Sequence, residues 1–408
     1  MSEGPGQGPD AVPPAGSGED GSGQVRPDIH AVRHPGDDLD GSAAGQVIGE
    51  LDWPADAAAS AGAAGLAAGG LTADGAAASP HGPPGAGVFS LEGRPAPGLY
   101  VAAWLLAVVG IGLFVVAGAA ASSASASNPV GPAGVALFFG AFTVLTVSLA
   151  SAAGYQVLAR ADRRADRYRG PSPLILLGVV IFGVTVVVGL LSAAGLIAPE
   201  SQSIGALVDV ALTTLAYLAA IWLFVVRTHA LDWPGMGWPA GWRLSPARLA
   251  GDLMSGVAMM VPTYFVTILV GGVIASLLGA QLPSVLPAPR TPIDTVATVL
   301  AAVVIAPIGE ESFFRGLALT AWWRDLGLRS ALLRATVFFA IVHILNVTAS
   351  NAGDGLRMAA LQFIVILPVG YVLGWLFSQR GIVASIAGHM TFNGIAVVLL
   401  LTAATIQR

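Results

Sequence analysis

Apolar positions divide the chain into two unlike parts. Residues 1–97 hold no long apolar run, whereas apolar stretches of membrane-spanning length recur from about residue 98 onward. A helix needs about 20 residues to cross about 30 Å of hydrocarbon. The run 329–347 is marginal because it contains Arg329 and Arg334, so we expect an all-α, polytopic membrane bundle of eight or nine transmembrane helices. The predicted spans lie near 99–121, 133–159, 173–198, 204–227, 251–278, 293–320, 329–347, 356–378 and 382–405.

The first 97 residues are rich in glycine, proline, alanine, serine and aspartate and nearly lack aromatic residues. Such a segment cannot bury enough apolar surface to offset the entropy of ordering it, so we predict a disordered tail. The tail carries 13 acidic residues against three arginines. Its first residues lack the basic start and apolar core of a secretory signal peptide. We expect accessory transmembrane helices over 98–250 and a second membrane domain, with the polar motifs described below, over 251–408.

Composition narrows the possible chemistry. Of the 408 residues, 55% are apolar and 11% are charged, and the mean hydropathy of +0.74 is typical of polytopic membrane proteins. The chain has no cysteine, and all 19 basic residues are arginine. These absences exclude thiolate metal sites, a cysteine nucleophile and lysine-based catalysis. The acidic tail argues against nucleic-acid binding. Arginine without lysine, together with abundant alanine and glycine, indicates a GC-rich bacterial genome.

Arginine also predicts how the spans are oriented. It gathers in the loops after the second, fourth, sixth and eighth predicted spans, most densely at residues 160–169. Short loops with an excess of positive charge lie on the cytoplasmic side of a membrane. We therefore expect a multi-pass protein of the plasma membrane, with these loops and the N-terminal tail in the cytoplasm.

The first polar motif at membrane depth is Glu310-Glu311-x-x-x-Arg315. Glu311 and Arg315 are four residues apart and share a helix face, where the arginine can hold the carboxylate by charge-assisted hydrogen bonds. Glu310 points about 100° away and is free for another role. A structural ion pair is the simpler interpretation, but a second, unpaired carboxylate in hydrocarbon is costly. Pro307 and Gly309 precede the motif and predict a bend or a restart of the helix.

Two further motifs follow on later spans. In Phe339-x-x-x-His343 the two rings share a helix face, so the phenylalanine can form one wall of the imidazole pocket. In His389-x-x-x-Asn393 two polar groups can face one point, and the flanking Gly388 and Gly394 would let another backbone or a substrate approach closely. Each motif alone also fits helix packing, because a buried histidine is commonly structural and an asparagine can bridge helices in lipid.

Together the three motifs supply what peptide hydrolysis needs. A glutamate can act as general base on water, and histidines can transfer protons or bind a metal. Asn393 or Arg315 can stabilise an oxyanion. His343 and His389 each lie nine residues, roughly 14 Å along a helix, after an arginine expected at the cytoplasmic interface, and Glu310 lies 12 residues, roughly 18 Å, before the Trp-Trp-Arg sequence that begins at Trp322. The sequence therefore predicts that these side chains meet around one water molecule, near the cytoplasmic leaflet.

The three motifs resemble the pattern of the CPBP family, the CAAX-protease and bacteriocin-processing membrane proteins that are also called Abi proteins. This family includes the type II CAAX prenyl endopeptidases. Its pattern is Glu-Glu-x-x-x-Arg, then Phe-x-x-x-His, then His-x-x-x-Asn or Asp, and the similarity covers about 293–405. The resemblance implies that 251–408 is the catalytic domain.

The resemblance also implies roles for the residues of the motifs. Glu310 and Glu311 would activate water together with His343, while His389 and Asn393 would polarise the scissile carbonyl. Arg315 would hold the glutamate pair. The motif leaves open which glutamate is the base.

The metal content is left open as well. The family has been described as metalloproteases, in which case the site would hold Zn²⁺ through Glu311, His343 and His389. A metal-free, glutamate-activated water is the alternative.

Three functions are consistent with these features. The first is an intramembrane endopeptidase that hydrolyses a peptide bond of a membrane-associated protein or peptide, such as a bacteriocin precursor, within the lipid bilayer. The second is a non-proteolytic membrane partner, such as a bacteriocin self-immunity or scaffold protein, that keeps the same polar cluster. The third is a proton-coupled transporter with a Glu–His relay, but we find no paired inverted repeats to support it. The sequence does not indicate an oligomeric state.

Other classes of membrane protease are disfavoured. The chain has no His-Glu-x-x-His motif of a zinc protease and no serine motif with a partner histidine. It also lacks a Gly-x-Gly-Asp aspartyl motif, and we expect Gly353 and Asp354, which come nearest to it, to lie in a loop.

Overall fold

The computed structural model describes residues 90–122, 131–197, 202–240, 245–280, 289–349 and 351–406. The predicted disordered tail lies outside these residues, apart from its last eight positions. The described residues form helices and contain no strand, which confirms the predicted all-α class.

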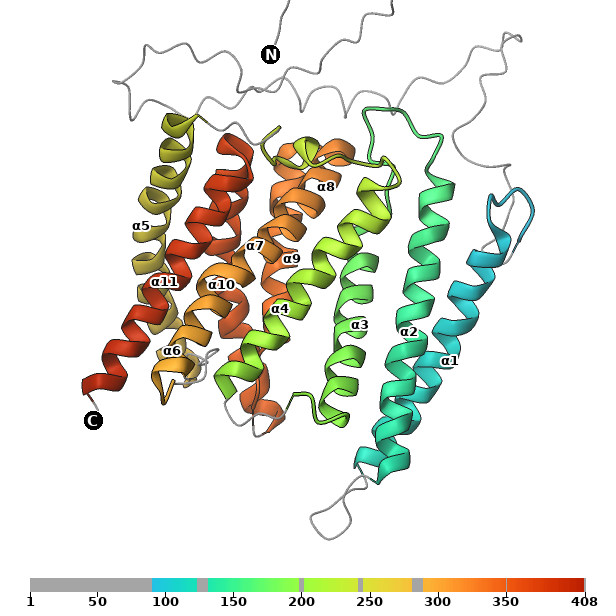
Figure 1. Ribbon diagram of the computed structural model, residues 1–408, viewed down its shortest axis with the longest axis horizontal. Helices are drawn as coiled ribbons and strands as arrows, with labels where there is room; N and C mark the ends of the chain where they lie inside the picture. The colour runs from blue at the N-terminus through green and yellow to red at the C-terminus, as the bar shows by residue number, and fades with distance from the viewer. Residues whose placement is uncertain are drawn as a thin grey trace, which may run out of the picture. The chain divides into compact units, whose positions relative to one another are not determined.

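Fifteen helical elements follow one another along the described chain (Figure 1). The first half contains α1 (Pro97–Ser122), α2 (Pro132–Ala159), α3 (Pro173–Ala193), α4 (Gln202–Ile221), the π-helical turn η2 (Trp222–Val226), the short 3₁₀ turn η3 (Pro234–Met236) and α5 (Pro246–Leu278). The second half contains α6 (Pro292–Val299), the π-helical turn η4 (Leu300–Ile305), α7 (Ala306–Glu311), the π-helical turn η5 (Ser312–Leu319), α8 (Thr320–Leu326), α9 (Leu328–Ile344), α10 (Ala352–Arg380) and α11 (Ile382–Ile406).

Eight helical rods among the described residues are long and apolar enough to cross a membrane. This is the lower of the two numbers that the sequence predicts. The marginal run near 329–347 forms α9, whose 17 residues span about 26 Å. α9 packs against α8 and α10 and so belongs to the bundle, although it is shorter than the other rods.

The central rod, Pro292–Leu326, carries the first polar motif and continues without a restart. It begins at a capping box in which the Thr291 hydroxyl accepts a hydrogen bond from the Asp294 backbone, and the Asp294 carboxylate accepts one from the Thr291 backbone. The helix passes through Pro307, so the restart predicted there does not occur. π-helical turns lie on either side of α7 instead. Such turns are frequent at functional sites because each shifts the register of the side chains that follow.

Small residues let other rods approach this region. α4 packs along α6 and α7, and a Cβ on Gly309 would lie 2.5 Å from the Thr214 hydroxyl oxygen and 3.0 Å from the Thr214 Cα. α5 and α11 meet in the same way, because a Cβ on Gly256 would lie 2.6 Å from the Gly388 nitrogen. Glycine is therefore required at Gly309 and Gly256, whereas a Cβ on Gly388 would meet the side chains of Met260, Leu376 and Leu373 rather than another backbone.

One expectation about the start of α10 is wrong. Gly353 and Asp354 lie in the first turn of α10 and not in a loop. The Asn351 side chain caps this helix by accepting a hydrogen bond from the Asp354 backbone at 2.9 Å, and Asp354 pairs with Arg357. The polar residues that suggested a turn serve as a helix cap.

Two of the arginine-bearing loops lie on the same side of the bundle. The loop after α2 is tied to the end of α8, where Asp325 pairs with Arg163 at 3.2 Å and its carbonyl accepts from Arg167 at 2.6 Å. Between these contacts the Tyr168 hydroxyl is buried and donates to the Pro171 carbonyl, and burial raises the pKa of this phenol above its usual value. This contact agrees with the alternation predicted from arginine.

Candidate active site

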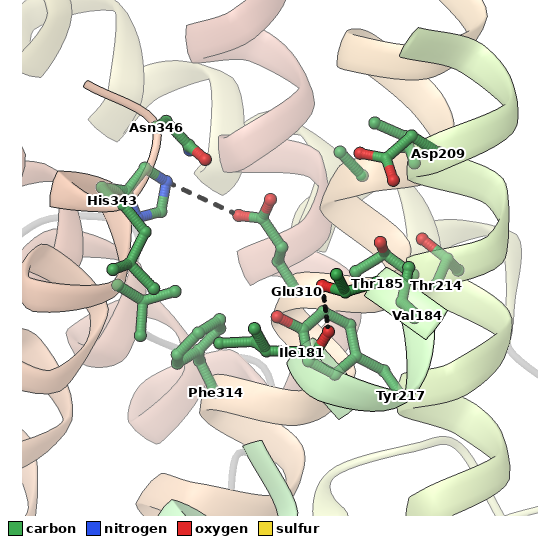
Figure 2. A pocket seen from close by; sticks show the side chains of 15 residues that line it. Ile181, Val184, Thr185, Asp209, Thr214, Tyr217, Glu310, Phe314, His343 and Asn346 are labelled. Carbon is green, nitrogen blue, oxygen red and sulfur yellow. Dashed lines mark hydrogen bonds and ion pairs between the residues drawn. The ribbon is translucent and has the colours of Figure 1, made fainter. Parts of the chain in front are cut away.

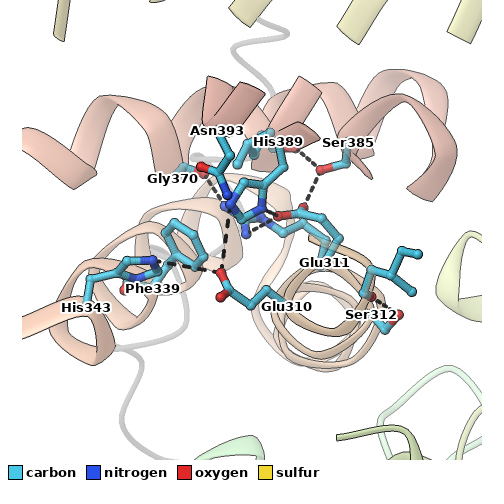
Figure 3. Close-up of polar contacts among 12 residues, drawn as sticks. Glu310, Glu311, Ser312, Phe339, His343, Gly370, Ser385, His389 and Asn393 are labelled. Atoms are coloured by element: carbon cyan, nitrogen blue, oxygen red, sulfur yellow. Dashed lines mark hydrogen bonds and ion pairs between the residues drawn. The ribbon is translucent and has the colours of Figure 1, made fainter. Parts of the chain in front are cut away.

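The three predicted motifs converge inside the bundle. The central rod contributes the two glutamates, α9 contributes Phe339 and His343, and α11 contributes His389 and Asn393. Figure 3 shows these side chains directed toward one another between the three elements. The spatial claim on which the sequence argument depends, that acidic and imidazole groups of three late helices meet, therefore holds in the structure.

Glu311 is fully buried and has three partners. Its Oε1 accepts from Arg315 Nη1 at 2.8 Å and contacts His389 Nδ1 at 2.8 Å, and its Oε2 accepts from the Ser385 hydroxyl at 2.5 Å. The helix spacing predicted the pair with Arg315. A buried carboxylate is stabilised only when its oxygens are hydrogen-bonded, and this one meets that condition.

Arg315 is held as tightly as its partner. Its side chain is 1% exposed, and its second terminal nitrogen donates to the Gly370 carbonyl on α10 at 3.1 Å. The guanidinium also lies over the Phe339 ring, with 4.1 Å between Cζ and the ring centroid. The resemblance implied that Arg315 holds both glutamates, but its ion pair is with Glu311.

The contacts of the two histidines set their tautomers. His343 Nδ1 lies 2.8 Å from the Phe339 carbonyl, which can only accept, so Nδ1 carries the proton. His389 Nδ1 faces Glu311 Oε1, which also accepts a hydrogen bond from Arg315, so the same nitrogen carries the proton there. Both rings therefore direct Nε2 toward Glu310 (Figure 3).

Glu310 stands between these two Nε2 atoms. Its Oε2 lies 3.8 Å from His343 Nε2 and 3.9 Å from His389 Nε2. Both distances are too long for a direct hydrogen bond and suit a bridging water. The buried Oε2 has no hydrogen-bond partner among the described residues, although the Glu310 side chain as a whole is 25% exposed. Glu310 is thus the member of the pair whose carboxylate is available for chemistry.

Phe339 forms a wall of this site, as its spacing from His343 predicted. Its ring centroid lies 4.2 Å from that of His343 and 6.0 Å from that of His389. The ring is buried, so it keeps both imidazoles and the Arg315 guanidinium in fixed positions.

Asn393 lies one helical turn after His389, and its amide nitrogen donates to the Ala302 carbonyl in η4 at 2.8 Å. This bond satisfies a backbone group of a π-helical turn and joins α11 to the central rod. One amide hydrogen remains for another acceptor, because a carboxamide nitrogen carries two.

Ser385 is a site residue that the sequence analysis missed. Its hydroxyl is fully buried and lies 2.5 Å from Glu311 Oε2 and 3.0 Å from the Leu373 carbonyl. The available signal was its spacing, because Ser385, His389 and Asn393 follow at intervals of four and share one face of α11.

A cavity of about 290 Å³ opens beside Glu310. Figure 2 shows Glu310 reaching into it, with His343 and Asn346 on one side and Asp209 of α4 on the other. Helices α3 and α4, which precede the three motifs, thus supply the wall that faces the glutamate.

The residues predicted to hold a metal do not fit one as they stand. Both oxygens of Glu311 are engaged by Arg315, His389 and Ser385, so this carboxylate has no side free for a metal ion. No group of three or more His, Asp or Glu side chains in the described part of the chain is arranged to hold a metal. The use of zinc stays a prediction, and we derive no step through it.

The fold and the site define a multi-pass membrane protein with a buried Glu–His–Arg centre. Residues 292–395 match the family model of the Rce1-like type II CAAX prenyl endopeptidases. This segment contains all three motifs, so the match confirms the family resemblance of that region. No curated protein and no solved structure matches the chain. The division into accessory helices and a catalytic domain at residue 250 stays a prediction, and α1 to α5 lie outside the matched segment.

Proposed function

We propose that the protein is an intramembrane endopeptidase that hydrolyses a peptide bond of a membrane-associated protein or peptide. The single observation that carries this proposal is the buried Glu310 Oε2, which lies between two imidazole nitrogens and beside a cavity and has no hydrogen-bond partner among the described residues. The family match to a class of endopeptidases over residues 292–395 supports it. The substrate is membrane-embedded or membrane-bound, because the site lies within the apolar helices.

In the proposed reaction a water molecule donates one hydrogen bond to Glu310 Oε2 and the other to one of the two histidine Nε2 atoms. Glu310 removes one proton as the water oxygen forms a bond with the scissile carbonyl carbon. The developing oxyanion is stabilised from α11, where the remaining Asn393 amide hydrogen can donate to it. The carbon–nitrogen bond then breaks, and the proton held by Glu310 passes to the leaving nitrogen.

The assignment of the base follows from the partners of the two glutamates. A general base must reach the proton it removes, directly or through one water. Glu311 has both oxygens in hydrogen bonds and no exposed surface, so its role in the proposal is to fix Arg315 and His389. Glu310 reaches the cavity, and no described residue forms a hydrogen bond with its Oε2.

The cavity also suggests from which side a substrate enters. Its lining includes Leu345 and Asn346, which follow the end of α9, and Asp209, which lies in the second turn of α4. The end of α9 and the start of α4 lie at the opposite ends of their helices from the arginine-bearing loops. We therefore propose access from the half opposite those loops, rather than near the leaflet that the arginine spacing suggested. The plasma membrane and a cytoplasmic N-terminus remain part of the proposal.

The test is a cleavage screen with purified protein in liposomes that contain membrane-anchored peptides. Wild-type protein and a Glu92→Gln control, which alters an exposed glutamate before α1, should cleave the same peptide. Glu310→Gln should reduce the rate by about a thousandfold while the thermal unfolding profile is kept. Equal rates in the wild type and Glu310→Gln would refute the assignment of the base. No cleavage by the wild type, with a biological effect that survives Glu310→Gln, would favour a non-proteolytic partner protein.

A further inference from the structure

Asp209 is an acidic residue of a membrane-spanning helix that the proposed mechanism does not use. It lies seven residues, about 10 Å, after the start of α4 at Gln202, inside the apolar rod Gln202–Val226. Its side chain is exposed, and Figure 2 shows it directed toward the cavity, across from His343 and Asn346.

A carboxylate at this position needs a reason. Ionisable groups within membrane spans are costly, so they face a water-filled cavity or a partner and usually mark a substrate path. Asp209 takes part in no hydrogen bond or ion pair with another described residue. The cavity lining contains Asp209 and Glu310 but no arginine. The described residues that line the cavity therefore supply two carboxyl groups and no guanidinium to pair with them.

We propose that Asp209 forms a subsite for a cationic side chain of the substrate, close to the peptide bond that is cleaved. The proposal rests on the endopeptidase function and adds a substrate class to it. Glu310 lies between Asp209 and His343 in Figure 2, so a peptide whose carbonyl meets Glu310 and His343 can direct a neighbouring side chain toward α4.

The walls of the cavity suit the shape of such a side chain. Ile181 and Val184 of α3 and Val210 of α4 belong to the same lining as Asp209. Arginine and lysine bury an aliphatic stem along apolar surface and place the charge at the tip, which matches apolar walls that lead to a carboxylate. A guanidinium can bind a carboxylate through two parallel hydrogen bonds and is the better match of the two.

A pair of matched peptides tests this specificity. The two peptides are N-acetylated and identical, except that one carries arginine and the other its neutral isostere citrulline next to the cleaved bond. Wild-type protein should cleave the arginine peptide with a kcat/KM about tenfold higher. Asp209→Asn should remove the preference by slowing only the arginine peptide, and Asp209→Glu should keep it. Asp166→Asn, which removes an exposed carboxylate paired with Arg164 in the loop after α2, is the matched control and should behave as the wild type.

A binding measurement separates this inference from the proposed reaction. In a Glu310→Gln background Asp209 is the one carboxylate among the described lining residues. A fluorescent arginine peptide should bind this variant about tenfold more tightly than the citrulline peptide, and adding Asp209→Asn should abolish the difference. A citrulline peptide with a free N-terminus identifies any contribution of a terminal ammonium. Equal binding of the arginine and acetylated citrulline peptides would refute the subsite even if cleavage occurs. Selective binding without cleavage would keep the subsite and refute the protease.

Discussion

Two adjacent glutamates of one helix occupy opposite environments. Glu311 is fully buried and engages Arg315, His389 and Ser385, whereas Glu310 reaches the cavity and has one oxygen that forms no hydrogen bond within the described part of the chain. The helix itself creates this difference, because consecutive side chains point about 100° apart. The comparison teaches that the conspicuous ion pair is the scaffold of this site and that its less conspicuous neighbour is the reactive group.

The largest expected difference between the two glutamates is in how much each contributes to the stability of the fold. Glu311→Ala leaves the buried Arg315 without its ion-pair partner and should lower the free energy of unfolding by about 3–5 kcal/mol. Glu310→Ala removes no hydrogen bond between described residues and should change the free energy of unfolding by less than about 0.5 kcal/mol. Detergent-denaturation curves of both variants measure the difference. The double variant Glu311→Ala/Arg315→Met should recover part of the loss, and similar losses in the two single variants would end the distinction between scaffold and reactive group.

A second difference concerns catalysis on the Glu310 side. His343→Gln should lower the cleavage rate about a hundredfold, because the imidazole would no longer help to position the water. The unfolding curve should barely change, since the Nδ1 bond of His343 is to the carbonyl of Phe339 in its own helix. Rates and unfolding curves from the same preparations provide the measurement. If His343→Gln unfolds as readily as Glu311→Ala, His343 has a structural role and not the catalytic role proposed for it.

Ser385 tests whether the hydrogen bonds of Glu311 matter for both stability and catalysis. Ser385→Ala removes one hydrogen bond to Glu311 and should cost about 1 kcal/mol of stability, together with an approximately tenfold slower cleavage. The effect on rate arises because Glu311 orients His389. Ser312→Ala is the matched control, since the buried Ser312 hydroxyl donates only to the Ile308 carbonyl in its own helix. If both substitutions slow cleavage equally, Ser385 has no special place in the site.

The smallest expected effect is that of a metal chelator. Because the oxygens of Glu311 are occupied by protein partners, we expect the cleavage rate to change by less than about twofold after exhaustive chelation. Metal analysis of the same samples accompanies the rate measurement. Loss of activity that added zinc restores would mean that Glu311 leaves its partners to bind a metal, and the scaffold interpretation would fail.

Most of the fold could be predicted from the lengths of the apolar runs, because a helix needs about 20 apolar residues to cross a bilayer and runs of this length recur along the chain. The pair of Glu311 with Arg315 followed from helix spacing alone. Ser385 and Asp209 did not, since their importance depends on which rods pack together, and apolar periodicity does not specify the neighbours of a helix in lipid. The π-helical turns around α7 also have no clear sequence signal. Whether the glutamates share one role was open until their partners were known.

The contact of Gly309 with Thr214 has a consequence for how specificity evolves. The backbones of two helices touch at that point, so the spacing between the glutamate and the opposite wall is set by an absent side chain. Adding a single methyl group there would act as a wedge and would alter which substrates fit without touching any of them. Selectivity in such a protein can thus drift through positions that no substrate ever contacts.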